Sequence, residues 1–132
     1  MSHTHSPNFL RRVLIADAVC SGVMGLVLIL AASALANVLA LPEALLRETG
    51  ILLLPFAAFV AWLASRAVVP RVPVWFVIAL NALWVFDSVV LLASGWVTPN
   101  VLGYAFVIAQ AAVVAVLAEL EYTGLRRAAV LA

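Results

Sequence analysis

The sequence predicts an all-α, polytopic membrane protein whose single domain is a bundle of four transmembrane helices. Hydrophobic residues make up 67% of the 132 residues and charged residues only 10%, whereas soluble domains are about half apolar and about a quarter charged. The apolar residues form four long runs, and four of the six prolines stand in the links between them, as expected for a residue that disfavours helix interiors; Pro55 lies early in the second run. Lipid is the solvent that accepts so much apolar surface.

The four apolar runs define the expected transmembrane segments, because crossing the hydrocarbon core takes about 20 apolar residues. The segments cover about residues 10–41, 51–69, 74–96 and 101–122. The first is longer than a membrane crossing requires, so it should tilt or continue beyond the bilayer. Because the links are short, consecutive helices should be neighbours and antiparallel, in up-down-up-down order. Residues 43–49 are expected to form a short amphipathic turn on the outer surface.

The placement of arginine predicts the orientation in the membrane. Arginines flank one set of helix ends at Arg11, Arg12, Arg66, Arg71, Arg126 and Arg127. Arg47 stands alone at the other set of ends. Because cytoplasmic loops carry an excess of basic residues, we expect both termini on the cytoplasmic side.

The composition argues against several classes of function. A net charge of +1 provides no basic stripe for nucleic acid. The single cysteine, Cys20, excludes a CxxC motif, and both histidines, His3 and His5, precede the first apolar run. The apolar runs therefore hold no histidine pair for haem and no histidine partner for a nucleophilic serine. We expect no enzymatic activity, no cofactor and no metal site.

Polar residues inside the apolar runs carry the most information, because a charge at the bilayer centre costs about 2.5–3.5 kcal/mol on insertion scales. The candidate intramembrane polar site consists of Asp87, Gln110, Asn81, Trp84 and Ser88. Four of them share one arc of the third helix, and Gln110 lies at a similar depth in the fourth. We expect the arc to face the bundle, with Asp87 hydrogen-bonded to Gln110 or to the Trp84 indole. Both a proton-coupled or ligand-binding centre and a structural hydrogen bond between helices fit this pattern.

A second polar group lies near the cytoplasmic ends of the helices. Asp17 is one to two turns inside the first helix, so a salt bridge to Arg66 or Arg12 is expected, with a proton or cation site as the alternative. Glu119 and Glu121 are expected to form a solvated collar of ion pairs with the two arginines that follow the fourth helix.

Three segments together resemble a widespread family of short bacterial integral membrane proteins of unassigned function. They are LPEALLRETGILLLPFAAFVAWLASR (41–66), ALNALWVFDSVVLLASG (79–95) and LAELEYTGLRR (117–127). The resemblance implies four helices in the bacterial cytoplasmic (inner) membrane. It carries no catalytic residue that can be transferred to this chain.

Three functions fit these observations, and each predicts a different interior. The first, which is the function we expect, is a non-enzymatic structural or accessory subunit that packs with itself or with a larger membrane complex, which requires a dry, tightly packed interior. The second is a small homodimeric proton-coupled transporter or channel that uses Asp87, which requires a polar cavity reaching that residue. The third is a binder of an apolar ligand such as a quinone or a lipid. That function requires an elongated apolar pocket that opens sideways to the bilayer.

Overall fold

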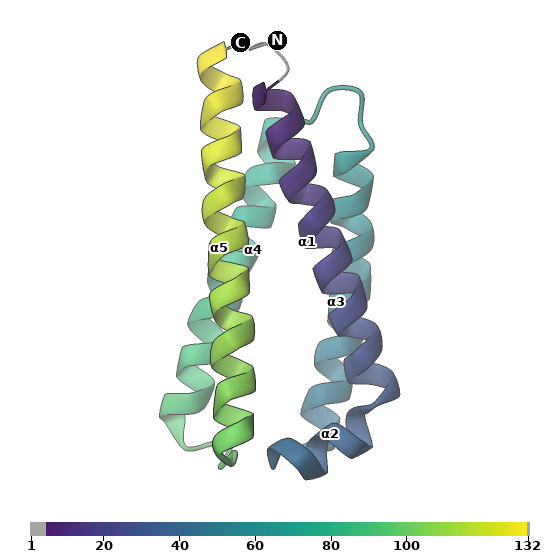
Figure 1. The fold of residues 1–132 in the computed structure, drawn as a ribbon, viewed down its shortest axis with the longest axis vertical. Coiled ribbons are helices and arrows are strands. Elements are labelled where there is room, and N and C mark those ends of the chain that lie inside the picture. The colour runs from purple at the N-terminus through teal and green to yellow at the C-terminus, as the bar shows by residue number, and fades with distance from the viewer. Residues whose placement is uncertain (1–4, 132) are drawn as a thin grey trace.

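The computed structural model of the chain describes residues 5–131, and side chains of residues 8–127, as helices with short links. The five helices are α1 (His5–Leu30), α2 (Ala32–Leu39), α3 (Glu43–Ala64), α4 (Arg71–Ser94) and α5 (Val101–Leu131) (Figure 1). All but α2 contain a segment long and apolar enough to cross a membrane. The prediction of an all-α chain with four long apolar helices is confirmed.

The first apolar run differs from its prediction, because it does not form one helix up to residue 41. α1 ends at Leu30, and the short α2 follows after a single turn residue. The end of α2 is held against the start of α5, where Asn100 Nδ2 donates to the carbonyl of Val38 at 2.8 Å and the Asn100 backbone N–H donates to the carbonyl of Leu39 at 3.2 Å. These bonds satisfy carbonyl groups that the end of a helix leaves without a partner.

Two other boundaries also differ. Residues 43–49, expected as a separate surface turn, are the first turns of α3. Pro42 is the N-cap of α3 and has an extended backbone, so the helix begins directly after it. The negative charge of Glu43 in the first turn interacts favourably with the positive end of the helix dipole. α5 continues past the expected end at residue 122 to Leu131. No proline follows Pro99, so nothing in the sequence stops this helix earlier.

The helices pair as two hairpins. α1 lies along α3 in the first hairpin, together with α2, and α4 lies along α5 in the second. α1 also packs on α5, whereas α3 and α4 scarcely touch (Figure 1). The start of α1 and the last turns of α5 lie at one end of the molecule, called the terminal end below, and α2 lies at the opposite end, called the α2 end.

Glycine permits the closest contact inside the first hairpin. A Cβ atom on Gly50 would lie 2.6 Å from the carbonyl oxygen of Gly25 and 2.8 Å from the Ile29 side chain. The backbones of α1 and α3 therefore touch at this point. Small residues commonly mark such close approaches between membrane helices.

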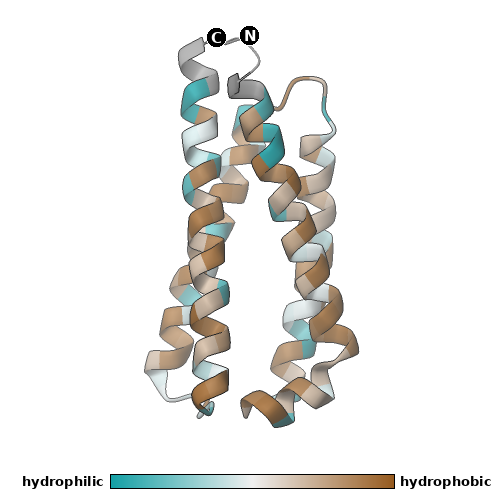
Figure 2. Ribbon diagram, in the orientation of Figure 1, coloured by the Kyte–Doolittle hydropathy of each residue, from teal (hydrophilic) through white to brown (hydrophobic). Residues whose placement is uncertain are grey.

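Two apolar clusters close the two ends of the molecule. The terminal-end cluster contains Leu10, Leu14, Val60, Leu63, Ala64, Val74, Val77 and Leu125. The α2-end cluster contains Leu28, Ala32, Leu39, Leu41, Leu46, Leu53, Val97 and Val107. Many large apolar side chains are exposed on all the long helices, while hydrophilic residues gather toward the terminal end (Figure 2). In lipid the two clusters stabilise the fold by close packing rather than by escape from water.

Candidate functional site

A group of buried polar side chains joins three helices between the two apolar clusters. Asn81 of α4 donates through Nδ2 to Oδ2 of Asp17 on α1 and to Oε1 of Glu121 on α5, both at 2.9 Å. Ser21, one turn along α1, donates to Oδ1 of Asp17 at 3.1 Å. We call these four residues the carboxyl cluster. They connect the first hairpin to the second.

Apart from the half-buried Ser21, the carboxyl cluster is almost completely shielded from the surroundings. Exposed fractions are 1% for Asp17, 5% for Asn81 and 0% for Glu121. Each of the three has a member of the terminal-end cluster about one turn away on its own helix, namely Leu14, Val77 and Leu125. The apolar cluster therefore closes the carboxyl cluster toward the terminal end. Within the described side chains, Oε2 of Glu121 is the one buried polar atom without a hydrogen-bond partner.

A second polar group lies nearer the α2 end and joins the two helices of the second hairpin. Trp84 donates through Nε1 to Oε1 of Gln110 at 2.6 Å. Gln110 donates through Nε2 to Oγ of Ser88 at 3.0 Å and to the carbonyl of Val107 at 3.0 Å. Ser88 donates to the carbonyl of Trp84 at 2.8 Å. In this tryptophan–glutamine cluster (Trp84, Ser88 and Gln110), every side-chain donor has an acceptor.

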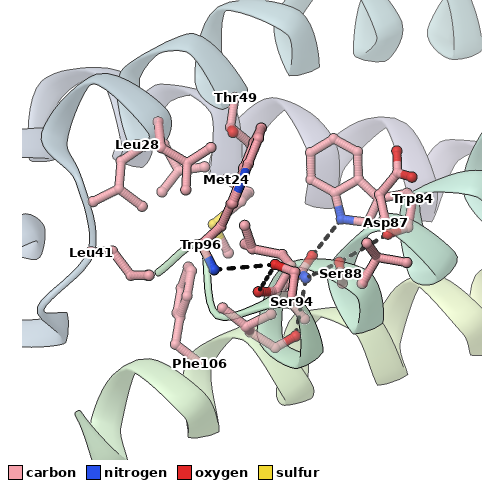
Figure 3. Close-up of a pocket in the computed structure, with 16 residues that line it drawn as sticks. Met24, Leu28, Leu41, Thr49, Trp84, Asp87, Ser88, Ser94, Trp96 and Phe106 are labelled. Atoms are coloured by element: carbon pink, nitrogen blue, oxygen red, sulfur yellow. Dashed lines mark hydrogen bonds between the residues drawn. The ribbon is translucent and has the colours of Figure 1, made fainter. Parts of the chain in front are cut away.

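Two hollows lie between the hairpins, and residues of both hairpins line them. The α2-side hollow has a volume of about 470 Å³ (Figure 3). The central hollow has a volume of about 560 Å³, and its wall includes Ser21 and Asn81 of the carboxyl cluster. Both walls are mostly apolar, and they share Met24, Trp84, Asp87 and Gln110.

Asp87 lies on this shared wall, which corrects the prediction that it is hydrogen-bonded inside the bundle. Its side chain is exposed, and among the described residues no group donates a hydrogen bond to it. Gln110, its expected partner, is hydrogen-bonded to Trp84 and Ser88 instead. Successive residues of a helix point roughly 100° apart. Because Ser88 faces α5, Asp87 is turned aside toward the hollows.

Asn81 also differs from its predicted place. The sequence pattern grouped it with Asp87, but Asn81 is buried in the carboxyl cluster and bonds to Asp17 and Glu121. The candidate intramembrane site is therefore divided between two clusters. Trp84, Ser88 and Gln110 form one, Asn81 belongs to the other, and Asp87 lines the space next to both.

The predicted ion pairs of Asp17 do not form among the described residues. Asp17 is buried facing α4 and α5, whereas Arg12 is exposed and Arg66 lies over the ring of Trp62 at 4.9 Å. The only salt bridge between described side chains joins Arg47 to Glu43 at 2.5 Å, at the α2 end. Asp17 lies too deep and faces the wrong way for the arginines of the terminal end.

Glu119 and Glu121 have different environments, so the predicted collar is wrong for Glu121. Glu119 is exposed, but Glu121 is fully buried. Arg126 lies over the Tyr122 ring at 5.7 Å rather than beside a carboxylate. The sequence does indicate which way Glu121 faces, because Glu121 follows Gln110 by about three helical turns and therefore lies on the same face of α5.

The fold and these contacts define a class of chain: an all-α protein with four helices able to span a membrane and with polar groups enclosed between two helical hairpins. Comparison with protein families, with curated proteins and with solved structures finds no match for this chain. Among the described residues, no group of three or more His, Cys, Asp or Glu side chains is placed to hold a metal ion. His3 and the side chain of His5 lie outside the described residues.

Proposed function

We propose that this chain is a non-enzymatic integral membrane protein that binds a lipid-like amphipathic molecule between its two hairpins. The apolar part of the ligand occupies the hollows, and Asp87 holds an amine or another cationic, hydrogen-bond-donating group at its end. One observation carries the proposal: two adjoining, mostly apolar hollows share a wall on which Asp87 has no partner among the described residues.

The size and position of the hollows support a lipid-like ligand. Volumes of about 470 and 560 Å³ lie within the range of roughly 300–1,000 Å³ that is common for small-molecule sites. Residues of α3 and α4 line both hollows, although these two helices scarcely touch. We infer that a ligand enters sideways from the bilayer between these two helices. An acyl chain can enter there without crossing a polar barrier.

The chemistry of Asp87 favours a cationic end group. A carboxylate in apolar surroundings is costly unless a cation or hydrogen-bond donors compensate it. The neighbouring donors of Trp84 and Gln110 are already used by other acceptors. An ammonium group supplies both charge and donors, whereas the carbonyl groups of a quinone would leave the Asp87 carboxylate uncompensated.

The same geometry favours ligand binding over the other two functions. A structural subunit was expected to have a tightly packed interior, and the hollows argue against that. A channel needs a path through the molecule, but the terminal-end cluster closes the interior on one side. The resemblance of the sequence supports a bacterial inner membrane as its location. We propose that both termini are cytoplasmic, because six of the seven arginines lie near the helix ends on the side of the termini.

Native mass spectrometry with two ligands of equal chain length tests the role of Asp87. We expect the purified protein to bind dodecylamine more tightly than dodecanol. Asp87→Asn should weaken dodecylamine binding by about tenfold, the effect of losing one charge-assisted hydrogen bond, and leave dodecanol binding unchanged. Glu119→Gln, an exposed carboxylate on α5, is the matched control and should bind both ligands like the wild type.

A second pair of variants tests the location. Val114 lines the central hollow, whereas Val116 on the same helix is 53% exposed and lines neither hollow. Val114→Phe should weaken binding of both ligands, and Val116→Phe should not. Full binding by Val114→Phe or by Asp87→Asn would refute the proposal. So would a dimer in which a second copy of the chain fills the hollows.

A further inference from the structure

We propose that the carboxyl cluster is a proton-binding site, and that the bound proton stabilises the contact between the two hairpins. Asp17 belongs to α1 in the first hairpin, while Asn81 and Glu121 belong to the second. This direct polar link between the hairpins lies beside the central hollow, to whose wall Asn81 contributes. The proposal does not depend on which molecule, if any, occupies the hollows.

The geometry of the two carboxyl groups requires one proton. An oxygen of Asp17 and an oxygen of Glu121 each lie 2.9 Å from the same nitrogen of Asn81, so the two oxygens are less than twice that distance apart. Two negative charges this close, both removed from solvent, repel each other strongly. Buried carboxyl pairs elsewhere relieve the repulsion by sharing one proton.

No basic side chain among the described residues compensates the pair. On α1, the guanidinium group of Arg11 donates to backbone carbonyls at the end of α3. On α4, Arg71 donates to the carbonyl of Leu125 at 3.3 Å. The other charged or titratable groups of the surrounding elements face elsewhere. Those of the first hairpin are Arg12 and Cys20, both exposed on α1, Glu43, Arg47 and Glu48 at the α2 end of α3, and Arg66 over Trp62. Those of the second hairpin are Asp87 on the hollow wall, Tyr104, Glu119 and Tyr122, all exposed on α5, Arg126 over Tyr122, and Arg127 over Phe9.

The hydrogen bonds indicate which oxygen carries the proton. Both oxygens of Asp17 accept hydrogen bonds, one from Ser21 and one from Asn81, as expected for an ionised carboxylate. Glu121 accepts only at Oε1, and its buried Oε2 has no partner. A proton on Oε2 makes Glu121 neutral. The one negative charge then lies on Asp17, where the hydrogen bonds from Ser21 and Asn81 stabilise it, and Asn81 also donates to the neutral Glu121.

The same geometry argues for a proton and against a metal ion. The amide nitrogen of Asn81, a hydrogen-bond donor, occupies the position between the two carboxyl groups where a metal ion would sit. The remaining free oxygen is Oε2 of Glu121. Hard metal ions need several oxygen ligands. One oxygen is enough for a proton.

Loss of the proton would weaken the contact between the hairpins. It places like charges on Asp17 of α1 and Glu121 of α5, which pack against each other. Because the terminal-end cluster seals the other side, the proton exchanges by way of the central hollow. Deprotonation therefore loosens the attachment of α1 to α5 and widens that hollow.

Infrared spectroscopy of the full-length protein in lipid nanodiscs tests the proposal directly, because a protonated carboxyl group has a carbonyl band distinct from the carboxylate bands. We expect the wild type to show this band at neutral pH and to lose it as the pH is raised. Glu121→Gln should abolish the band at neutral pH. Glu119→Gln and Asp87→Asn should keep it, which separates this site from the one proposed for the ligand.

Thermal unfolding over the same pH range gives an independent readout. A proton that the folded state holds and the unfolded state releases stabilises the fold at low pH, and this stabilisation is lost as the pH rises. The melting temperature of the wild type should fall as the pH rises toward the value at which the band disappears and should level off there, whereas that of Glu121→Gln should not fall in this range. If Glu121→Gln does not fold, the loss of the infrared band of the wild type with rising pH still tests the proposal. Absence of the band at neutral pH, its persistence in Glu121→Gln, or a band that responds to sodium but not to choline at fixed pH would each overturn the proposal.

Discussion

The hydrogen bond from the Trp84 indole to Gln110 is the strongest candidate for a structural role among the single polar contacts, since it joins α4 to α5 at 2.6 Å. A double-mutant cycle with Trp84→Phe and Gln110→Leu should give a coupling free energy of about 0.6–2 kcal/mol, the range for polar contacts between membrane helices. Reversible unfolding in mixed detergent micelles measures this coupling. Coupling indistinguishable from zero would mean that the bond contributes nothing to stability.

Backbone conformation at single residues gives a second prediction. Ala40, the C-cap of α2, has a left-handed backbone with φ 56°, which costs a residue with a Cβ about 1–2 kcal/mol. Ala40→Gly should therefore raise the free energy of unfolding by about 1 kcal/mol. Gly95 offers the reverse test, because its φ is 79° and a Cβ would meet no atom within 4 Å. Gly95→Ala should lower the free energy of unfolding by a similar amount, and equal stability of all three proteins would disprove the argument.

At the scale of helices, the contact between α1 and α3 depends on the absence of a side chain at one position. Gly50→Ala should destabilise the protein by about 1–3 kcal/mol, because its Cβ would lie 2.6 Å from the Gly25 carbonyl oxygen and rigid backbone cannot move aside cheaply. Gly22→Ala is the matched control. Its Cβ would lie 3.7 Å from Cβ of Ala57, an ordinary contact.

Both substitutions gain the same intrinsic helix propensity, about 1 kcal/mol. The difference between them in unfolding free energy therefore isolates the clash at Gly50. We expect Gly22→Ala to be as stable as the wild type or more stable. Equal effects of the two substitutions would show that α1 and α3 do not approach closely at Gly50.

The helices were predictable from the sequence because apolar length and proline spacing depend on local chemistry. The break between α1 and α2 was not, since the residues around it, Leu30 to Ala32, include neither glycine nor proline. The end of α2 is held by Asn100, far away in the chain, which binds the carbonyls of Val38 and Leu39. Tertiary contacts of this kind leave no local pattern.

The candidate site was predictable in part for the same reason. Helical spacing placed Trp84 and Ser88 on one face, and depth placed Gln110 opposite them, as the structure has them. Spacing within one helix cannot show how that helix is rotated against its neighbours. That rotation turns Asp87 toward the hollows and brings Glu121 to Asn81.

For the whole molecule, the division into two hairpins explains how polar groups and hollows coexist in so small a chain. The hairpins meet at the terminal-end cluster, at the carboxyl cluster, and again where α2 reaches α5. Between these contacts lie the hollows. The fold is thus closed at both ends and hollow in its middle, where the proposed ligand would lie between the hairpins.

The orientation of the whole molecule in the membrane gives the last prediction. Ser65 and Ser94 are exposed and lie at opposite ends of the bundle. Ser65 follows α3 at the terminal end, and Ser94 is the last residue of α4 at the α2 end. In a Cys20→Ser background, which removes the one native cysteine, Ser94→Cys should react with a membrane-impermeant maleimide added to intact bacterial cells. Ser65→Cys should react only after the inner membrane is opened, because the arginines of the terminal end favour the cytoplasmic side. The reverse pattern would place the termini outside, and equal labelling of both variants in intact cells would contradict a membrane-spanning bundle.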